Sequence, residues 1–155
     1  AVDSHKALPR VNASRAALNA RDFAPFKRLN HIPMGMTAHI VFEDIDPDAP
    51  ATTSAAMMDV IRTDIGFHGL IMSDDLSMEA LSGTSYERAA ATIAAGCDIV
   101  LHCNGAPDQM QAVAEASGTM TTQARIRADI ALDMRKTPDD IDIGSLEAEL
   151  TALLG

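Results

Sequence analysis

The amino-acid sequence predicts an α/β fold in which parallel strands alternate with helices. Between Met36 and Ala116, apolar runs of strand length alternate with longer segments of helical periodicity, which is the pattern of parallel strands joined by crossover helices. The run Leu70–Met72 is apolar at every residue, as is typical of a parallel strand covered on both faces. Units of this kind form either a closed barrel or a doubly wound sheet, and the alternation alone leaves both open.

The composition indicates one globular domain with an aliphatic core. The 155 residues are 47% hydrophobic and 22% charged, but only 3% are aromatic, so aliphatic and methionine side chains must fill the core. A formal net charge of -10 argues against a nucleic-acid partner, which requires a basic face. No Lys or Arg run suggests a membrane surface, and no segment reaches the roughly 18 apolar residues of a membrane span.

The cysteines and histidines predict neither a disulfide nor a metal site. If residues 97–103 form one strand, Cys97 and Cys103 lie roughly 20 Å apart at about 3.3 Å per residue, too far to pair. Reduced thiols favour a cytoplasmic location. No histidine or cysteine pair has the close spacing of a zinc site, and no glycine-rich phosphate loop is present. We therefore expect no cofactor.

The N-terminal third is expected to contain an extended entry followed by a helix. Pro9 and the polar residues around it predict a loop over residues 1–11. A helix is predicted over Ser14–Leu29, with Ser14 as its N-cap and Pro25 marking a break or a new first turn.

The next predicted strand–helix unit begins with a strand over Met36–Phe42. It contains His39, which we expect to be a hydrogen-bonded core residue because a single histidine among apolar neighbours usually is one. A helix follows over Ser54–Ile65, capped by Ser54 and apolar on one side.

The rest of the chain continues the alternation after the strand at Leu70. A short helix is expected over Leu76–Leu81. Further helices are predicted at Ser85–Ala95, Pro107–Ala116, Thr121–Met134 and Asp142–Leu154, and a strand at Asp98–Cys103. Gly96 and Gly118 mark helix C-termini, and Pro107 marks a helix start.

Two adjacent carboxylates, Asp74 and Asp75, follow the buried strand and are the candidate reactive groups. Carboxylates at the end of a buried strand are costly to desolvate unless they are paired or used, and the carboxyl ends of barrel strands hold active sites. The alternative is structural, since Ser and Asp are preferred N-caps and a helix is expected at Leu76. Strand alternation puts Asp74 on the face of Met72 and Asp75 on the face of Ser73, leaving open which face points inward.

Three stretches carry a family resemblance. GFHGLIMSDDLSM resembles the nucleophile signature of glycoside hydrolase family 3, specifically of its NagZ-type β-N-acetylhexosaminidases. DSHKALP is similar to the D-S-H-x-x-L-P loop of the same enzymes, and MTAHIVFEDIDPDAPAT to their M-T-A-H-V and D-P-x-x-P-A-T segments. The resemblance implies that Asp74 is the nucleophile, that His5 is the general acid/base and that Asp3 orients His5. It assigns to Asp75 the capping of the helix at Leu76.

The resemblance also selects a TIM (β/α)8 barrel, of which this chain would be the C-terminal part. Such barrels take about 250 residues. Residues 1–155 would therefore be a single partial family-3 N-terminal-type barrel domain with about three strands. The family's sugar-binding K-H-F-P-G-H-G segment would precede Ala1.

The implied function is retaining removal of terminal N-acetylglucosamine from peptidoglycan fragments in cytoplasmic cell-wall recycling. The implied substrate is an N-acetylglucosaminyl anhydromuropeptide. Two alternatives stay open. The chain is a non-catalytic half-barrel that needs a complementing N-terminal half, or it belongs to a phosphorylase that uses the same histidine.

Overall fold

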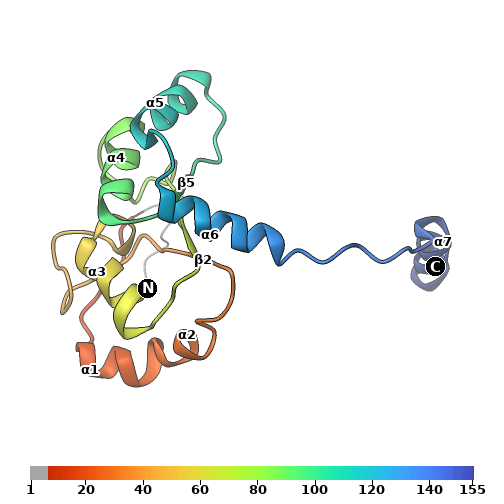
Figure 1. Ribbon diagram of the computed structural model, residues 1–155, viewed down its shortest axis with the longest axis horizontal. Coiled ribbons are helices and arrows are strands. Elements are labelled where there is room, and N and C mark those ends of the chain that lie inside the picture. Colours follow the sequence, from red (N-terminus) through yellow and green to blue (C-terminus); the bar gives the residue numbers. More distant parts are fainter. Residues whose placement is uncertain (1–6) are drawn as a thin grey trace.

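The computed structural model describes residues 7–155 as short parallel sheets surrounded by helices (Figure 1). The elements in chain order are β1 (Arg10–Val11), α1 (Arg15–Ala17), the π-helix η1 (Leu18–Asp22), α2 (Ala24–Arg28), β2 (Met34–Met36), β3 (Val41–Phe42), the 3-10 turn η2 (Ala51–Thr53), α3 (Ala55–Asp59), the π-helix η3 (Val60–Asp64), β4 (Leu70–Asp75), α4 (Ser85–Ala95), β5 (Ile99–Leu101), α5 (Pro107–Ser117), α6 (Thr122–Asp133) and α7 (Ile143–Leu154).

All strand pairs described are parallel, as the alternation predicts. One sheet has the order β2-β4-β5, with β4 in the centre, and β1 pairs with β3 in a second, two-stranded sheet. The single strand predicted over Met36–Phe42 is wrong, because β2 ends at Met36 and β3 begins at Val41 in the other sheet. The chain changes sheets there because the Thr37 and His39 side chains turn inward and bond to Thr52.

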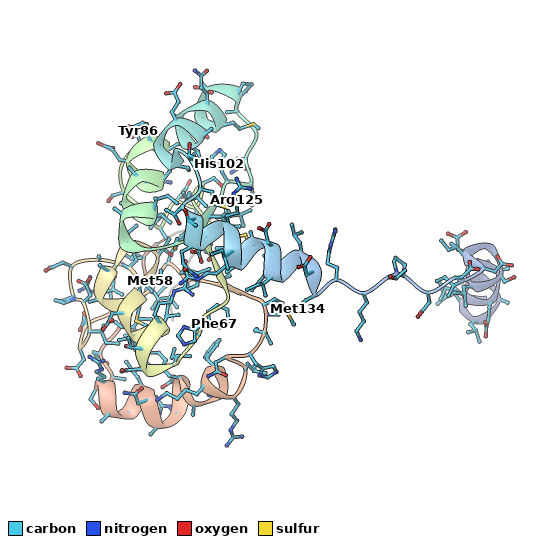
Figure 2. The ribbon with its side chains drawn as sticks, in the orientation of Figure 1. Met58, Phe67, Tyr86, His102, Arg125 and Met134 are labelled. Carbon is cyan, nitrogen blue, oxygen red and sulfur yellow. The ribbon has the colours of Figure 1, made fainter. Side chains whose placement is uncertain are left out.

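The main hydrophobic core lies between the three-stranded sheet and the helices η1, α3 and η3. Met58 and Phe67 both belong to it (Figure 2). Its buried members are Leu18, Phe23, Ala51, Met57, Met58, Val60, Ile65, Phe67, Ile71 and Cys97. Gly69 permits the close approach of β4 to the preceding chain, since a Cβ there would lie 2.6 Å from the Pro33 carbonyl oxygen and 2.7 Å from Phe67.

A second core joins β5, α4 and α5 to the loop after β4, and it overturns one predicted helix. Residues 76–83 form turns, and α4 begins only at Ser85, capped by Thr84 with Glu87 in a capping box. The turns replace the predicted helix at Leu76–Leu81 because Arg88 reaches back from α4 and donates to the Leu76 and Met78 carbonyl oxygens.

The helix-boundary residues predicted from the sequence are largely confirmed. The Ser14 and Ser54 side chains accept from the backbone N–H groups of Ala17 and Met57, and Gly96 ends α4 with a φ of 113°. The predicted helices Ser14–Leu29 and Ser54–Ile65 are less regular than expected, because each contains a π-helical turn.

One face of the three-stranded sheet is incompletely covered within residues 7–155. Gly35 packs against Phe67 of the core, so Met34 and Met36 point to the opposite face, where they are 42% and 53% exposed. α7 stands apart from the sheets in Figure 1, and all its residues are exposed. In the described part of the chain, no helix combines the length and apolar character needed to cross a membrane.

We expect the 155-residue chain to self-associate through this uncovered sheet face, because an apolar face beside an unpaired strand edge favours association. Light scattering after size exclusion would measure this. The double change Met34→Lys and Met36→Lys should shift the chain toward monomer. Met110→Lys is the matched control, since Met110 is also 53% exposed but lies on α5. A monodisperse monomer formed by the unaltered chain would contradict the expectation.

Candidate active site

The carboxyl end of β4 extends beyond β2, and side-chain hydrogen bonds hold it on both edges. β2 ends at Met36, and the Thr37 hydroxyl then accepts from the Asp74 N–H at 3.3 Å. On the other edge, the Ser73 hydroxyl accepts from the Leu101 N–H at 2.9 Å. The strand end is therefore held on one edge by Thr37, just after β2, and on the other by Ser73 of β4 itself.

The burial pattern of β4 decides which way Asp74 points. Ile71 and Ser73 are 2% and 0% exposed, and Ile71 belongs to the core under the helices. Met72 and Asp74 alternate with them, are half-buried and face the other side of the sheet. A bulge between Met72 and Asp75 shifts the register against β5, and such irregularities re-aim side chains.

Asp75 is committed to the local structure. Its carboxylate accepts from the Ser77 N–H at 2.9 Å, from the Ser77 hydroxyl and from the Cys103 N–H at 3.0 Å. Burial alone would raise the pKa of the Asp75 carboxyl, but the bonds from Ser77 and Cys103 outweigh it and hold that pKa below its ordinary value. The expected capping role is corrected, because Asp75 caps a turn at Ser77 and no helix starts at Leu76.

Asp74 is held more loosely. Within residues 7–155 its carboxylate accepts one hydrogen bond, from the Asp75 N–H to Oδ1 at 2.8 Å. This bond fixes the side-chain rotamer and leaves Oδ2 without a partner among these residues. The arrangement suits a carboxylate that reacts with a bound molecule, since its neighbour and not Asp74 itself carries the structural bonds.

Sequence reasoning missed the contribution of the β5 end to this site. The sequence predicts no role for Cys103 in the site, and both cysteines are free thiols. Cys103 instead supplies a backbone N–H to Asp75, and the Asn104 side chain donates to the Ser77 hydroxyl at 2.9 Å. Burial, followed by the nearby Asp75 and Asp74 carboxylates, raises the pKa of the Cys103 thiol. The available signal was that β4 and β5 are parallel neighbours whose carboxyl ends meet.

The two other predicted site residues, Asp3 and His5, lie outside the described residues. Their roles therefore stay predictions. Among residues 7–155, His, Cys, Asp and Glu side chains form no group of three or more that could hold a metal ion. His39 is 0% exposed with both ring nitrogens hydrogen-bonded, which confirms the prediction that it is a bonded core residue.

Comparison with known families decides the membership of the chain. Residues 1–131 match the glycosyl hydrolase family 3 N-terminal domain. The chain belongs to glycosyl hydrolase family 3. A family-3 relative, the β-hexosaminidase of Alkalilimnicola ehrlichii, is 44% identical over 118 residues, which cover 73% of this chain and 33% of that protein. This family-3 chain thus spans about a third of the length of that curated relative.

Solved family-3 structures share the fold. The β-N-acetylglucosaminidase of a Paenibacillus species is 26% identical with a TM-score of 0.74, over 92% of this chain and 31% of that one. NagZ from Neisseria gonorrhoeae, solved in complex with N-trifluoroacetyl-D-glucosamine, is 32% identical with a TM-score of 0.71, over 96% of this chain and 41% of that one. The resemblance noticed in the sequence motifs is confirmed at the level of the family.

Proposed function

We propose that this chain carries the nucleophile and the general acid/base of a retaining β-N-acetylglucosaminidase. The observation that carries the proposal is the difference between the two adjacent carboxylates. The Asp75 carboxylate is occupied by bonds from Ser77 and Cys103, whereas the Asp74 carboxylate faces the less covered side of the sheet and accepts one described bond. The similarity to β-hexosaminidases and to NagZ supports the same reaction.

In the proposed mechanism, Asp74 attacks the anomeric carbon of a terminal β-linked N-acetylglucosamine. The bond to the leaving oxygen breaks as His5 gives that oxygen a proton, and the sugar stays attached to Asp74 as an ester. His5 then takes a proton from water, whose oxygen attacks the anomeric carbon and releases Asp74. Asp3 acts as a positioning residue that holds one imidazole nitrogen and favours the charged ring.

A histidine acid has a physical advantage beside a carboxylate nucleophile. Two carboxyl groups at short distance couple electrostatically, so their protonation states depend on each other. An imidazolium is instead attracted to the Asp74 carboxylate. The pair therefore keeps a charged nucleophile and a protonated acid together.

We propose that residues 1–155 form one partial domain, the C-terminal part of a (β/α)8 barrel. The matched part of this chain covers only about a third to two fifths of the length of its relatives, which supports this proposal. The exposed Met34 and Met36 would then line the barrel interior. A complementing N-terminal half would supply most sugar contacts. The substrate would be an N-acetylglucosaminyl anhydromuropeptide, and the setting cytoplasmic peptidoglycan recycling.

A complementation assay tests the proposed function. The chain is expressed alone and fused behind the N-terminal half of the Alkalilimnicola ehrlichii relative, and release of an aryl aglycone from an N-acetylglucosaminide is followed. We expect activity only in the fusion. A fusion that folds but remains inactive would contradict the proposal. The product separates the phosphorylase alternative, because a phosphorylase forms the sugar 1-phosphate in phosphate buffer, whereas a hydrolase forms the free sugar.

Replacing His5 with Ala in the active fusion should slow different substrates unequally. Natural disaccharides need a proton on the leaving oxygen, so their cleavage should fall by about 10²–10⁴-fold. An aryl glycoside with a good leaving group needs little protonation, so its first step should fall much less. Burst and steady-state kinetics on both substrates measure the two effects. Equal losses on both would remove His5 from the acid role.

A further inference from the structure

A closed chain of buried hydrogen bonds runs from the backbone of Asp74 to that of Asp75. The Asp74 N–H meets the Thr37 hydroxyl at 3.3 Å, and the Thr37 and Thr52 hydroxyls lie 2.9 Å apart. Thr52 lies 2.8 Å from His39 Nδ1, and His39 Nε2 lies 2.9 Å from the Asp75 carbonyl oxygen. Thr37, His39 and Thr52 are 7%, 0% and 0% exposed.

The two backbone ends fix the outer hydrogen bonds, and an accepting Nδ1 then gives a direction to each bond between them. The Asp75 carbonyl can only accept, so His39 Nε2 carries a hydrogen. In the arrangement inferred here, Nδ1 accepts from the Thr52 hydroxyl. The Thr52 proton is thereby used, so Thr37 donates to Thr52 and is left to accept from the Asp74 N–H. Every donor then has an acceptor, which is the condition for burying such groups at low cost.

The neighbouring cysteine adds no charge beside these hydrogen bonds. Cys97 packs beside it, with its Sγ 3.9 Å from the Thr52 carbonyl oxygen. Burial raises the pKa of the Cys97 thiol to about 12, so this neighbour carries no charge near neutral pH. These buried hydrogen bonds are distinct from the bonds that hold the Asp75 carboxylate, which come from Ser77 and Cys103.

The geometry points to His39, Thr52 and Thr37 as a positioning clamp for the reactive carboxylate. They bond to the Asp74 N–H and to the Asp75 carbonyl oxygen. The backbone pairing of β2 with β4 ends at Met36 and Met72, so these side chains hold the dipeptide on the β2 side. A displacement of about 1 Å in a reacting group can cost about 10²-fold in rate. We therefore expect loss of the clamp to lower kcat more than it changes KM. This inference rests on the proposed role of Asp74.

The tautomer of His39 gives a test that needs no activity. In the 155-residue chain labelled with 15N-histidine, ring couplings of His39, assigned by the loss of its signals in His39→Gln, should show a protonated Nε2 and an unprotonated Nδ1 at neutral pH. Exchange of the Asp74 amide hydrogen should be slow, and Thr52→Val should accelerate it. A protonated Nδ1, or an amide unaffected by Thr52→Val, would overturn the clamp whatever the enzyme does.

Kinetics of the active fusion test the consequence. Thr52→Val should lower kcat by about tenfold to a hundredfold with KM unchanged, and Thr52→Ser, which keeps the hydroxyl, should restore it. Thr92→Val is the matched control, since Thr92 is also 0% exposed but its hydroxyl donates to the Arg88 carbonyl oxygen within α4. It should leave kcat unchanged. If Thr52→Val does not fold, His39→Gln is used in its place. The shorter glutamine side chain can keep the hydrogen bond to Thr52 or the one to the Asp75 carbonyl oxygen, but not both.

The outcomes distinguish a failure of the clamp from a failure of the proposed glycosidase function. Equal kcat losses in Thr52→Val and Thr92→Val, or a Thr52→Val effect confined to KM, would reduce the clamp to ordinary packing and overturn it. A fusion without any glycosidase activity would defeat the proposed function, while the tautomer and the Asp74 amide exchange would still decide whether the clamp exists.

Discussion

Asp74→Ala is expected to abolish turnover in the completed barrel, because it removes the group that forms the glycosyl-enzyme. Added azide should restore part of the rate by attacking the anomeric carbon in place of the lost carboxylate. The product from a β-linked substrate is then the α-glycosyl azide, with inverted configuration. The measurement is steady-state release of an aryl aglycone with and without azide, together with analysis of the azide product. Full activity in Asp74→Ala would contradict the role of this residue.

Asp75→Ala is the matched control for this change. It should leave catalysis largely intact and lower the free energy of unfolding by about 1–2 kcal/mol, since the bonds from Ser77 and Cys103 are lost. The sign of the pH dependence follows from the lowered pKa of Asp75. Its stabilising contribution is present above the ordinary carboxyl pKa and is lost as the pH falls through the folded-state pKa, so the variant should lack this loss.

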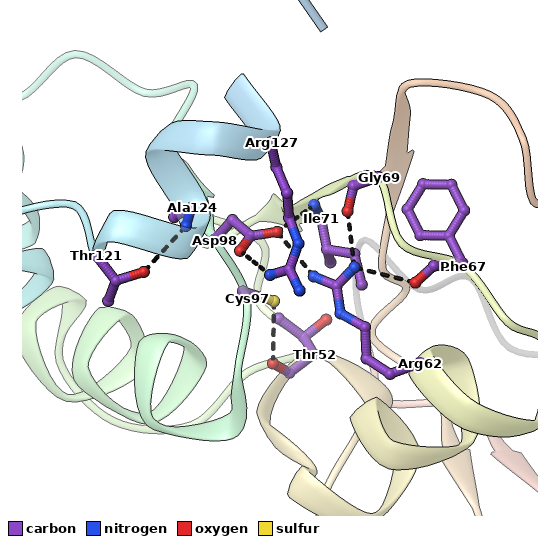
Figure 3. A network of polar contacts seen from close by, with 10 residues as sticks. All are labelled: Thr52, Arg62, Phe67, Gly69, Ile71, Cys97, Asp98, Thr121, Ala124 and Arg127. Atoms are coloured by element: carbon purple, nitrogen blue, oxygen red, sulfur yellow. Dashed lines mark hydrogen bonds and ion pairs between the residues drawn. The ribbon is translucent and has the colours of Figure 1, made fainter. Parts of the chain in front are cut away.

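Asp98→Asn is expected to cause the largest loss of stability. The Asp98 side chain is 4% exposed, pairs with Arg62 at 2.8 Å and with Arg127 at 2.7 Å, and accepts from the Ile71 N–H (Figure 3). Arg62 also donates to the Gly69 carbonyl oxygen. Removing the charge leaves two largely buried guanidinium groups uncompensated, and breaking a buried pair in this way costs about 3–5 kcal/mol.

Asp98→Asn should loosen α6 in particular, besides lowering the stability of the whole fold. Arg127 attaches α6 to the amino end of the sheet, so hydrogen exchange in α6 should accelerate before exchange in β4. Urea unfolding and peptide-level hydrogen exchange measure the two effects. Asp129→Asn, an exposed carboxylate on the same helix, is the control and should change stability by less than about 0.5 kcal/mol. Equal effects of the two changes would show that the buried pairs contribute little.

The sequence predicted those features of the fold that depend on residues close together in the chain. Ser14 and Ser54 cap helices through bonds to residues three positions away, Gly96 ends a helix, and the apolar run at Leu70 forms the central parallel strand. The parallel α/β class follows from the alternation of such segments.

The features that sequence reasoning missed depend on partners distant in the chain. The strand over Met36–Phe42 is interrupted because His39 bonds to Thr52 and to Asp75. The segment after Asp75 forms turns because Arg88 satisfies its carbonyl groups from the next helix. In the same way, the share of the β5 end in the site depends on a register shift that no local pattern encodes.

The choice between the two adjacent carboxylates can be measured directly. A fluorinated N-acetylglucosaminyl donor, whose glycosyl-enzyme hydrolyses slowly, is added to the completed barrel. Trypsin cleaves after Arg62 and Arg88, so both carboxylates lie on the peptide 63–88, and fragmentation between Asp74 and Asp75 locates the sugar. We predict the sugar on Asp74. A sugar on Asp75 would contradict the assignment of the nucleophile and the structural role given to Asp75.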